Sequence, residues 1–253
     1  MLLFRWIYTV WGIFLFICGM LLQAIVFGLA SLLPRQQAVA VSIRYNNIFV
    51  TIWAFLMGIR YNIVGAERLD KRQAYIFASN HTSTLDVMTT NAAIWQPFSP
   101  LAKKEVTKIP ILGYVFSKVS VLVDRSNAES RRKSVIELQK TVAQGISILL
   151  FPEGTRNRTG QPPLLPFKSG AIRIALESDR PIVPMALIGA RRIMPNSRPP
   201  FTLHRHTLSC YFGEPIPVAD IPMTDENIDL LKQRVFDAID QLLRQHDPDY
   251  AVV

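Results

Sequence analysis

The chain of 253 residues carries 28 Lys and Arg against 19 Asp and Glu, a formal net charge of +9, and 49% of its residues are hydrophobic. This composition excludes an intrinsically disordered chain, and two cysteines, Cys18 and Cys210, are too few for a disulfide framework. The length suits one domain of ordinary size with an appendage, rather than a multidomain assembly.

The start of the chain is nearly free of charge. Residues 1–60 contain four Arg but no Lys, Asp or Glu, and no charged residue lies between Trp6 and Leu33. As a helix, those 28 residues span about 42 Å, against roughly 30 Å for the hydrocarbon core of a bilayer. The apolar region of a cleaved signal peptide would run for only about 7 to 15 residues. The segment is therefore expected to stay in or on a membrane.

A second apolar stretch, Val39 to Ile59, follows Pro34 and is interrupted by Arg44 and two Asn residues. Aromatic residues of the kind that settle at headgroup depth accompany both stretches: Trp6, Tyr8, Trp11 and Trp53. We therefore predict that residues 1–62 form a two-helix membrane-docking element. The pattern fits both a spanning hairpin and helices that lie in the plane of the interface.

The pattern changes after residue 62, where short apolar runs alternate with amphipathic stretches. This alternation predicts that residues 63–253 form one α/β domain, with a mainly parallel central sheet flanked by helices. The predicted strands are Tyr75–Ser79, Val119–Val123, Ile146–Phe151, Ile182–Ile188 and Thr207–Phe212. A helix is predicted over Ala128–Gln144 with Gly145 as its stop, and a last helix begins after Thr224 as its cap.

The first polar cluster, Asn80 to Asp86, directly follows a predicted strand. Positions five apart on a regular helix lie about 140° out of phase, so His81 and Asp86 meet only across a turn. In that arrangement the carboxylate holds one imidazole nitrogen and leaves the other free as a base. The alternative is structural: Asn80 or Thr82 caps the next helix, and the Asp86 carboxylate is favourably placed at the positive end of that helix's dipole.

The second cluster, Phe151 to Arg156, also follows a strand. Gly154 permits close backbone approach to a ligand, Thr155 offers a hydroxyl, and Arg156 presents a planar fork of donors suited to phosphate. Taken alone, Pro-Glu-Gly is as readily an ordinary turn, with Arg156 as a solvated charge.

Together these clusters resemble the glycerolipid acyltransferase family typified by the 1-acylglycerol-3-phosphate acyltransferases. Asn80, His81 and Asp86 match its N-H-x-x-x-x-D block, and Phe151–Arg156 matches its third block. Val119–Arg125 is similar to the second block, although Val119 stands where the family often has Gly, and Ile182–Pro184 is similar to the fourth. The resemblance runs from about Gly65 to Leu187, and bacterial members also begin with two membrane-docking helices.

The resemblance implies acyl transfer from a thioester to a lysophospholipid hydroxyl, with His81 as the base and Asp86 holding its tautomer. Glu153 would orient Arg156 or the glycerol hydroxyls. The substrate-binding residues that it implies are Asn80, Lys103, Lys104, Arg125, Glu153, Gly154, Thr155 and Arg156.

The expected acceptor is 1-acylglycerol-3-phosphate (lysophosphatidic acid), and the expected donor is acyl-CoA or acyl carrier protein, with no further cofactor. Other chemistries have weaker support, because the chain lacks a G-x-S-x-G elbow and Gly-rich nucleotide loops, and His204 and His206 lack the companions of a zinc site. The positive charge fits anionic headgroups better than nucleic acid. The expected location is the bacterial inner membrane, with the catalytic domain facing the cytoplasm. Two alternatives stay open: another lysophospholipid as acceptor, or a noncatalytic lipid-binding protein of the same fold.

Overall fold

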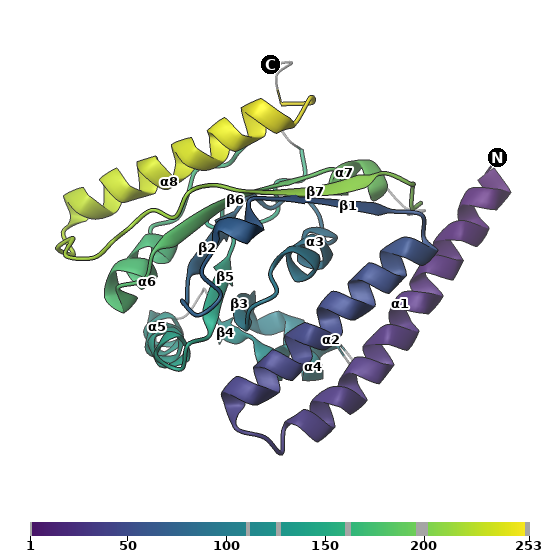
Figure 1. The fold of residues 1–253 in the computed structure, drawn as a ribbon, viewed down its shortest axis with the longest axis horizontal. Coiled ribbons are helices and arrows are strands. Elements are labelled where there is room, and N and C mark those ends of the chain that lie inside the picture. Colours follow the sequence, from purple (N-terminus) through teal and green to yellow (C-terminus); the bar gives the residue numbers. More distant parts are fainter. Residues whose placement is uncertain (1, 110–111, 125–127, 160–162, 196–201, 251–253) are drawn as a thin grey trace.

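The computed structural model describes residues 2–109, 112–124, 128–159, 163–195 and 202–250. Within them, one seven-stranded sheet has the order β1-β7-β6-β2-β5-β3-β4 (Figure 1). The strands are β1 Arg60–Val64, β2 Ile76–Ser79, β3 Phe98–Lys103, β4 Val121–Val123, β5 Ser147–Leu150, β6 Ile182–Ile188 and β7 Thr207–Phe212.

The sheet is mainly parallel, as predicted. Strands β6, β2, β5, β3 and β4 pair in parallel, and only the β6–β7 pairing is antiparallel among the described strands. In the registers, Ile76 of β2 lies opposite Ile148 of β5 on one side and Ile182 of β6 on the other. Five strands therefore point the same way, and the loops that follow them meet at one edge of the sheet.

Helices cover both faces of this sheet (Figure 1). On one face, α5, α6 and α8 pack against Ile76, Ile148 and their neighbours, and on the other α2 and α3 pack against Phe77 and Leu149. The helices of the α/β part are α3 Asp86–Ala93, α4 Leu112–Val119, α5 Ala128–Ala143, α6 Gly170–Ser178, α7 Ala190–Ile193 and α8 Asp225–His246, with short 3-10 turns at Ala66–Arg68 and Lys104–Lys108.

The predicted helix signals are confirmed. Gly145, just beyond α5, has φ +75°, and the Thr224 hydroxyl accepts a hydrogen bond from the Asn227 N–H at 3.2 Å at the start of α8. The five predicted strands are also present, most of them one or two residues shorter than expected. Strands β1 and β3 were not predicted.

The chain begins with two helices side by side, α1 Leu2–Ala30 and α2 Arg35–Leu56 (Figure 1). Both are long and apolar enough to cross a membrane. Helix α1 leaves a row of large apolar side chains exposed, and Cys18 is exposed on the same helix. Helix α2 instead buries Val39, Ile43 and Trp53 against the α/β part. The other cysteine, Cys210, lies fully buried in β7.

Candidate active site

The turn after β2 brings His81 and Asp86 together. Asp86 is the first residue of α3, and its Oδ2 lies 2.9 Å from Nδ1 of His81. The carboxylate is fully buried, whereas the imidazole keeps 16% of its surface exposed. The two residues thus meet across a turn, as their spacing predicted, and the pairing of Nδ1 leaves Nε2 as the nitrogen available to a substrate.

Asp86 also shapes this turn. The same Oδ2 accepts hydrogen bonds from the backbone N–H groups of Thr82 at 2.6 Å and Ser83 at 2.7 Å. The other oxygen, Oδ1, is buried and has no hydrogen-bond partner in the described part of the chain. The alternative in which Asn80 or Thr82 caps α3 is wrong, because the cap residue is Leu85 and no side chain makes a cap hydrogen bond there. Asp86 does lie in the first turn of α3, where one of its oxygens organises the preceding backbone and holds the imidazole at once.

Glu153, in the turn after β5, contacts the backbone of His81. Its Oε1 accepts from the His81 N–H at 2.7 Å, and its Oε2 accepts from the Leu165 N–H at 3.1 Å. Burial raises the pKa of Glu153 to about 7, and the Asp86 charge adds to this, against the lowering effect of the two N–H groups. Each carboxylate oxygen therefore accepts from a backbone donor, and a role of Glu153 in orienting Arg156 or the glycerol hydroxyls stays a prediction.

Arg156 follows in the same turn and is exposed. Its Nη1 donates to the hydroxyl of Thr84 at 2.5 Å, so the guanidinium reaches across to the His81–Asp86 turn. Gly154 has φ +72°, the backbone conformation that glycine adopts without strain, and Thr155 is exposed beside it. Loops from two adjacent parallel strands therefore bring a histidine and an exposed cation to one edge.

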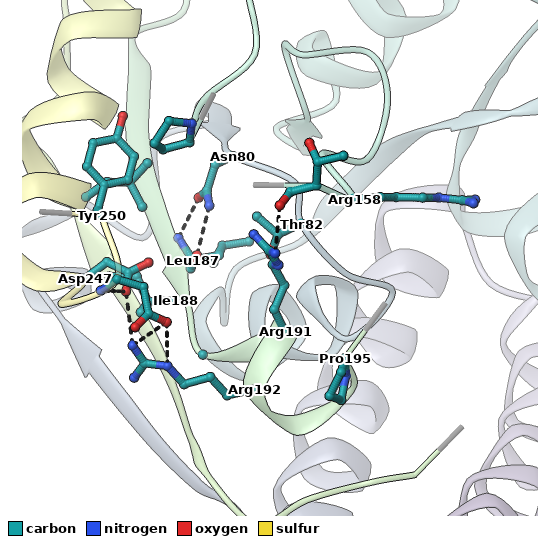
Figure 2. A pocket seen from close by; sticks show the side chains of 15 residues that line it. Asn80, Thr82, Arg158, Leu187, Ile188, Arg191, Arg192, Pro195, Asp247 and Tyr250 are labelled. Carbon is teal, nitrogen blue, oxygen red and sulfur yellow. Dashed lines mark hydrogen bonds and ion pairs between the residues drawn. The ribbon is translucent and has the colours of Figure 1, made fainter. Parts of the chain in front are cut away.

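Asn80 is bound to the fold through both polar atoms of its side chain. Its Nδ2 donates to the Leu187 carbonyl at 2.9 Å, and its Oδ1 accepts from the Leu187 N–H at 2.7 Å (Figure 2). These bonds give Asn80 a structural role, and its direct contact with substrate stays a prediction. Asn80 does line a cavity of about 610 Å³ on the β6 side of the turn, but the His81 side chain is not part of its wall.

Two further predicted cations, Lys103 and Lys104, lie along the same edge. Lys103 ends β3 and pairs with Glu105 at 3.0 Å, and Lys104 begins the next 3-10 turn with its side chain exposed. Arg125 lies outside the described residues. Across those residues, no group of three or more His, Cys, Asp or Glu side chains is placed to hold a metal ion.

Sequence reasoning missed three residues around the turn. The Phe151 ring stacks on the His81 imidazole, the Thr84 hydroxyl accepts from Arg156, and the Leu165 N–H binds Glu153. Phe151 and Thr84 lie inside the two polar clusters, but nothing in the sequence indicates that each contacts a residue about 70 positions away. Leu165 had no signal at all, because it contributes only its backbone.

A protein-family model described as Acyltransferase matches residues 60–188, which is more than half of the chain. The chain belongs to the acyltransferase family. The matched region holds both turns of the site and most of the parallel sheet, so the family resemblance on residues 80–86 and 151–156 is confirmed.

Individual relatives carry more specific names. A 1-acyl-sn-glycerol-3-phosphate acyltransferase of Limnanthes douglasii is 36% identical over 190 residues, which cover 69% of this chain and 63% of the relative. A Borreliella burgdorferi protein of the same name is 31% identical, covering 64% and 65%, and the human alpha form is 33% identical, covering 53% and 47%. The chain thus spans between about half and two thirds of the length of these relatives.

A solved structure supports the fold of this family member. The crystal structure of the 1-acyl-sn-glycerophosphate (LPA) acyltransferase PlsC of Thermotoga maritima superposes with a TM-score of 0.80, covering 97% of each chain. At 20% sequence identity, this likeness shows a shared fold that includes the two N-terminal helices.

Proposed function

We propose that this protein is a 1-acylglycerol-3-phosphate acyltransferase, which forms phosphatidic acid from lysophosphatidic acid and an acyl thioester. The observation that carries the proposal is the pairing of His81 with the buried Asp86, beside the exposed Arg156. The names of the relatives support the choice of reaction and acceptor.

His81 would act as a general base. Its Nε2 takes the proton from the sn-2 hydroxyl of the acceptor while the hydroxyl oxygen attacks the thioester carbonyl. The C–S bond then breaks, the thiol leaves with a proton returned from His81, and the new ester remains on the glycerol. Asp86 fixes the imidazole through Nδ1 and stabilises the imidazolium in between.

Arg156 would bind the phosphate of the acceptor, with Lys103 and Lys104 at the end of β3, and Arg125, as further cations. Guanidinium groups suit phosphate because their donors form a fixed fork. Gly154 and Thr155 would contact the substrate from the same turn. The donor is acyl-CoA or acyl carrier protein, and the reaction as written needs no other cofactor.

Residues 1–62 would dock the enzyme on a membrane. The exposed apolar side chains of α1 support this role, and a lysophospholipid acceptor is itself held in a bilayer. In a bacterial cell the proposed place is the cytoplasmic face of the inner membrane, because CoA and acyl carrier protein thioesters occur in the cytoplasm.

The test is an acyl-transfer assay of the purified full chain in lipid vesicles, with both donors and with lysophosphatidic acid against zwitterionic lysophospholipids. We expect preference for lysophosphatidic acid. His81→Ala should reduce kcat by about 10² to 10⁴, the usual size of a general-base effect, and Asp86→Asn should reduce it nearly as much.

His206→Ala is the matched control, because this histidine is exposed and directly precedes β7, which is separated from β2 by β6. Near-normal turnover by a folded His81→Ala protein would exclude His81 as the base. Transfer to no lysolipid from either donor would favour the noncatalytic lipid-binding alternative, and preference for a zwitterionic acceptor would assign another lysophospholipid.

A further inference from the structure

Phe151 lies flat against the candidate base. The ring centroids of Phe151 and His81 are 3.9 Å apart, and the two ring planes are within 16° of parallel. Phe151 directly follows β5 and is half-buried, packed against the buried cluster that contains Phe77. The ring therefore packs against the core and presents one face to the imidazole.

The segment that contains Phe151 also holds the His81 backbone. The Glu153 carboxylate accepts from the His81 N–H, and the Asn157 N–H donates to the His81 carbonyl, each at 2.7 Å. Glu153 and Asn157 are almost fully buried. Residues 151–157 thus fix His81 at its N–H, its C=O and its ring face, while Asp86 holds the ring edge from α3.

The stacked ring has a chemical consequence as well as a steric one. An aromatic face carries negative electrostatic potential and attracts a cation placed over it. His81 becomes such a cation when it accepts the hydroxyl proton, so a π face in contact with it favours the protonated state that the reaction passes through. Asp86 acts on the same cation in the plane of the ring, so the two contributions are separable by mutation.

We propose that Phe151 is a positioning residue for this reaction: its ring face holds the His81 imidazole in the attacking orientation and stabilises the imidazolium. The inference rests on the proposed function, in which His81 is the base. It assigns Phe151 an effect on kcat and not on the binding of either substrate.

The first test compares Phe151→Leu with Phe151→Tyr in the vesicle assay, after the wild-type reaction has been measured. Leucine keeps an apolar side chain but removes the planar face, and tyrosine keeps both. We expect Phe151→Leu to lower kcat about tenfold with both KM values within twofold of wild type, and Phe151→Tyr to retain most of kcat. Phe236→Leu is the control, because that half-buried ring of α8 packs on Phe167, in the cluster that covers the opposite face of the sheet from Phe77.

A merely structural role predicts a different result. If Phe151→Leu keeps the wild-type kcat, or if its loss appears in KM, Phe151 does not position the base. Equal losses in Phe151→Leu and Phe151→Tyr would overturn the proposal in the same way. Absence of acyl transfer by the wild-type protein would instead remove the proposed function itself.

The second test remains decisive if Phe151→Leu does not fold. Phenylalanines with one to five ring fluorines, incorporated at position 151, keep the ring shape and progressively weaken the negative face. We expect kcat to fall stepwise with fluorine number while the melting temperature stays nearly constant. A flat series would overturn the electrostatic part of the proposal, and a fall that follows the melting temperature would assign Phe151 to packing.

Discussion

The exposed guanidinium of Arg156 contacts a neutral hydroxyl, that of Thr84, rather than a carboxylate. A neutral partner leaves the full positive charge available to an incoming phosphate, and a charge-assisted hydrogen bond contributes about 1.5 to 3 kcal/mol. We therefore expect Arg156→Ala to raise the KM for lysophosphatidic acid at least tenfold and to change the donor KM less than threefold.

Steady-state kinetics with each substrate varied in turn measures this difference. Thr84→Val is the matched control, because it removes the internal partner and keeps the cation, and it should leave the acceptor KM within about threefold of wild type. Equal increases in both KM values for Arg156→Ala would indicate that the arginine only supports the turn.

Glu153 makes the stability of the protein depend on pH. Burial raises its pKa from 4.5 to about 7, so the folded state binds a proton more tightly than the unfolded state does. A raised carboxyl pKa means that stability is lost as pH rises through this window, and the shift corresponds to about 3 kcal/mol. The free energy of unfolding, relative to Glu153→Gln, should therefore fall between pH 4.5 and 7 and level off above.

Denaturant unfolding of both proteins at pH 4.5, 6 and 8 tests this. Glu226→Gln, at an exposed glutamate in the first turn of α8, supplies the control slope. An unchanged difference across the range would show that the Glu153 carboxyl titrates alike in the folded and unfolded chain.

Asn80 joins the end of β2 to the neighbouring strand β6. Two buried hydrogen bonds connect its side chain to both backbone groups of Leu187, and alanine would leave that N–H and carbonyl unpaired. We expect Asn80→Ala to lower the free energy of unfolding by about 2 to 3 kcal/mol.

Denaturant unfolding measures this loss against Asn62→Ala. Asn62 makes a comparable hydrogen bond to the Tyr211 hydroxyl at 3.0 Å, but in an exposed position, so its loss should stay within about 0.5 kcal/mol. A similar small change for Asn80→Ala, with a raised substrate KM, would show that Asn80 contacts the substrate instead.

Mutations in α1 and α2 should affect the folded protein differently, because only α2 contributes heavily to the core of the α/β part. Deletion of residues 1–60 would expose Phe77 and Met88, which pack against α2, so substitutions on α1 test membrane docking more cleanly. Ile7 and Phe14 lie two turns apart and are 57% and 55% exposed. An Asp at either position costs roughly 2.5 to 3.5 kcal/mol in hydrocarbon.

We expect the double variant Ile7→Asp with Phe14→Asp to shift from the membrane pellet to the supernatant and to lose activity on vesicles. Activity on a short-chain, water-soluble acceptor should remain. Leu230→Asp, at a 69% exposed leucine of α8, is the control and should stay with the membrane. Wild-type sedimentation of the double variant would rule out this face of α1 as the docking surface.

The elements that the sequence predicted are those with a strong local signal. The five predicted apolar runs are strands, and Gly145 and Thr224 mark the ends of helices, because each of these signals lies within a few residues of the chain. Strand β3 was missed because Pro100 within Phe98–Lys103 cannot donate to a ladder, and proline usually argues against a strand. Strand β1 was missed because its exposed and half-buried residues alternate over only five positions, beside a helix.

The site depends on the order of the strands in the sheet, which no local pattern in the sequence reveals. Strand β5 lies beside β2 although about 70 residues separate them, and this adjacency brings residues 151–157 onto His81. The sequence therefore predicted the His81–Asp86 pair, whose members are five residues apart. It gave no sign of the contacts that Glu153 makes, because the partners of that carboxylate are backbone groups, one of them at the end of another strand.

The two cysteines lie in opposite environments, one exposed on α1 and one fully enclosed in β7. Burial raises the pKa of the Cys210 thiol, which keeps it in the unreactive protonated form, and the sheet shields it from reagents. The natural chain therefore carries one addressable attachment point for a spin label or fluorophore, midway along the helix whose immersion is in question. Depth-dependent quenchers read at that point would distinguish a helix that spans the bilayer from one that lies along its surface, without altering a single residue.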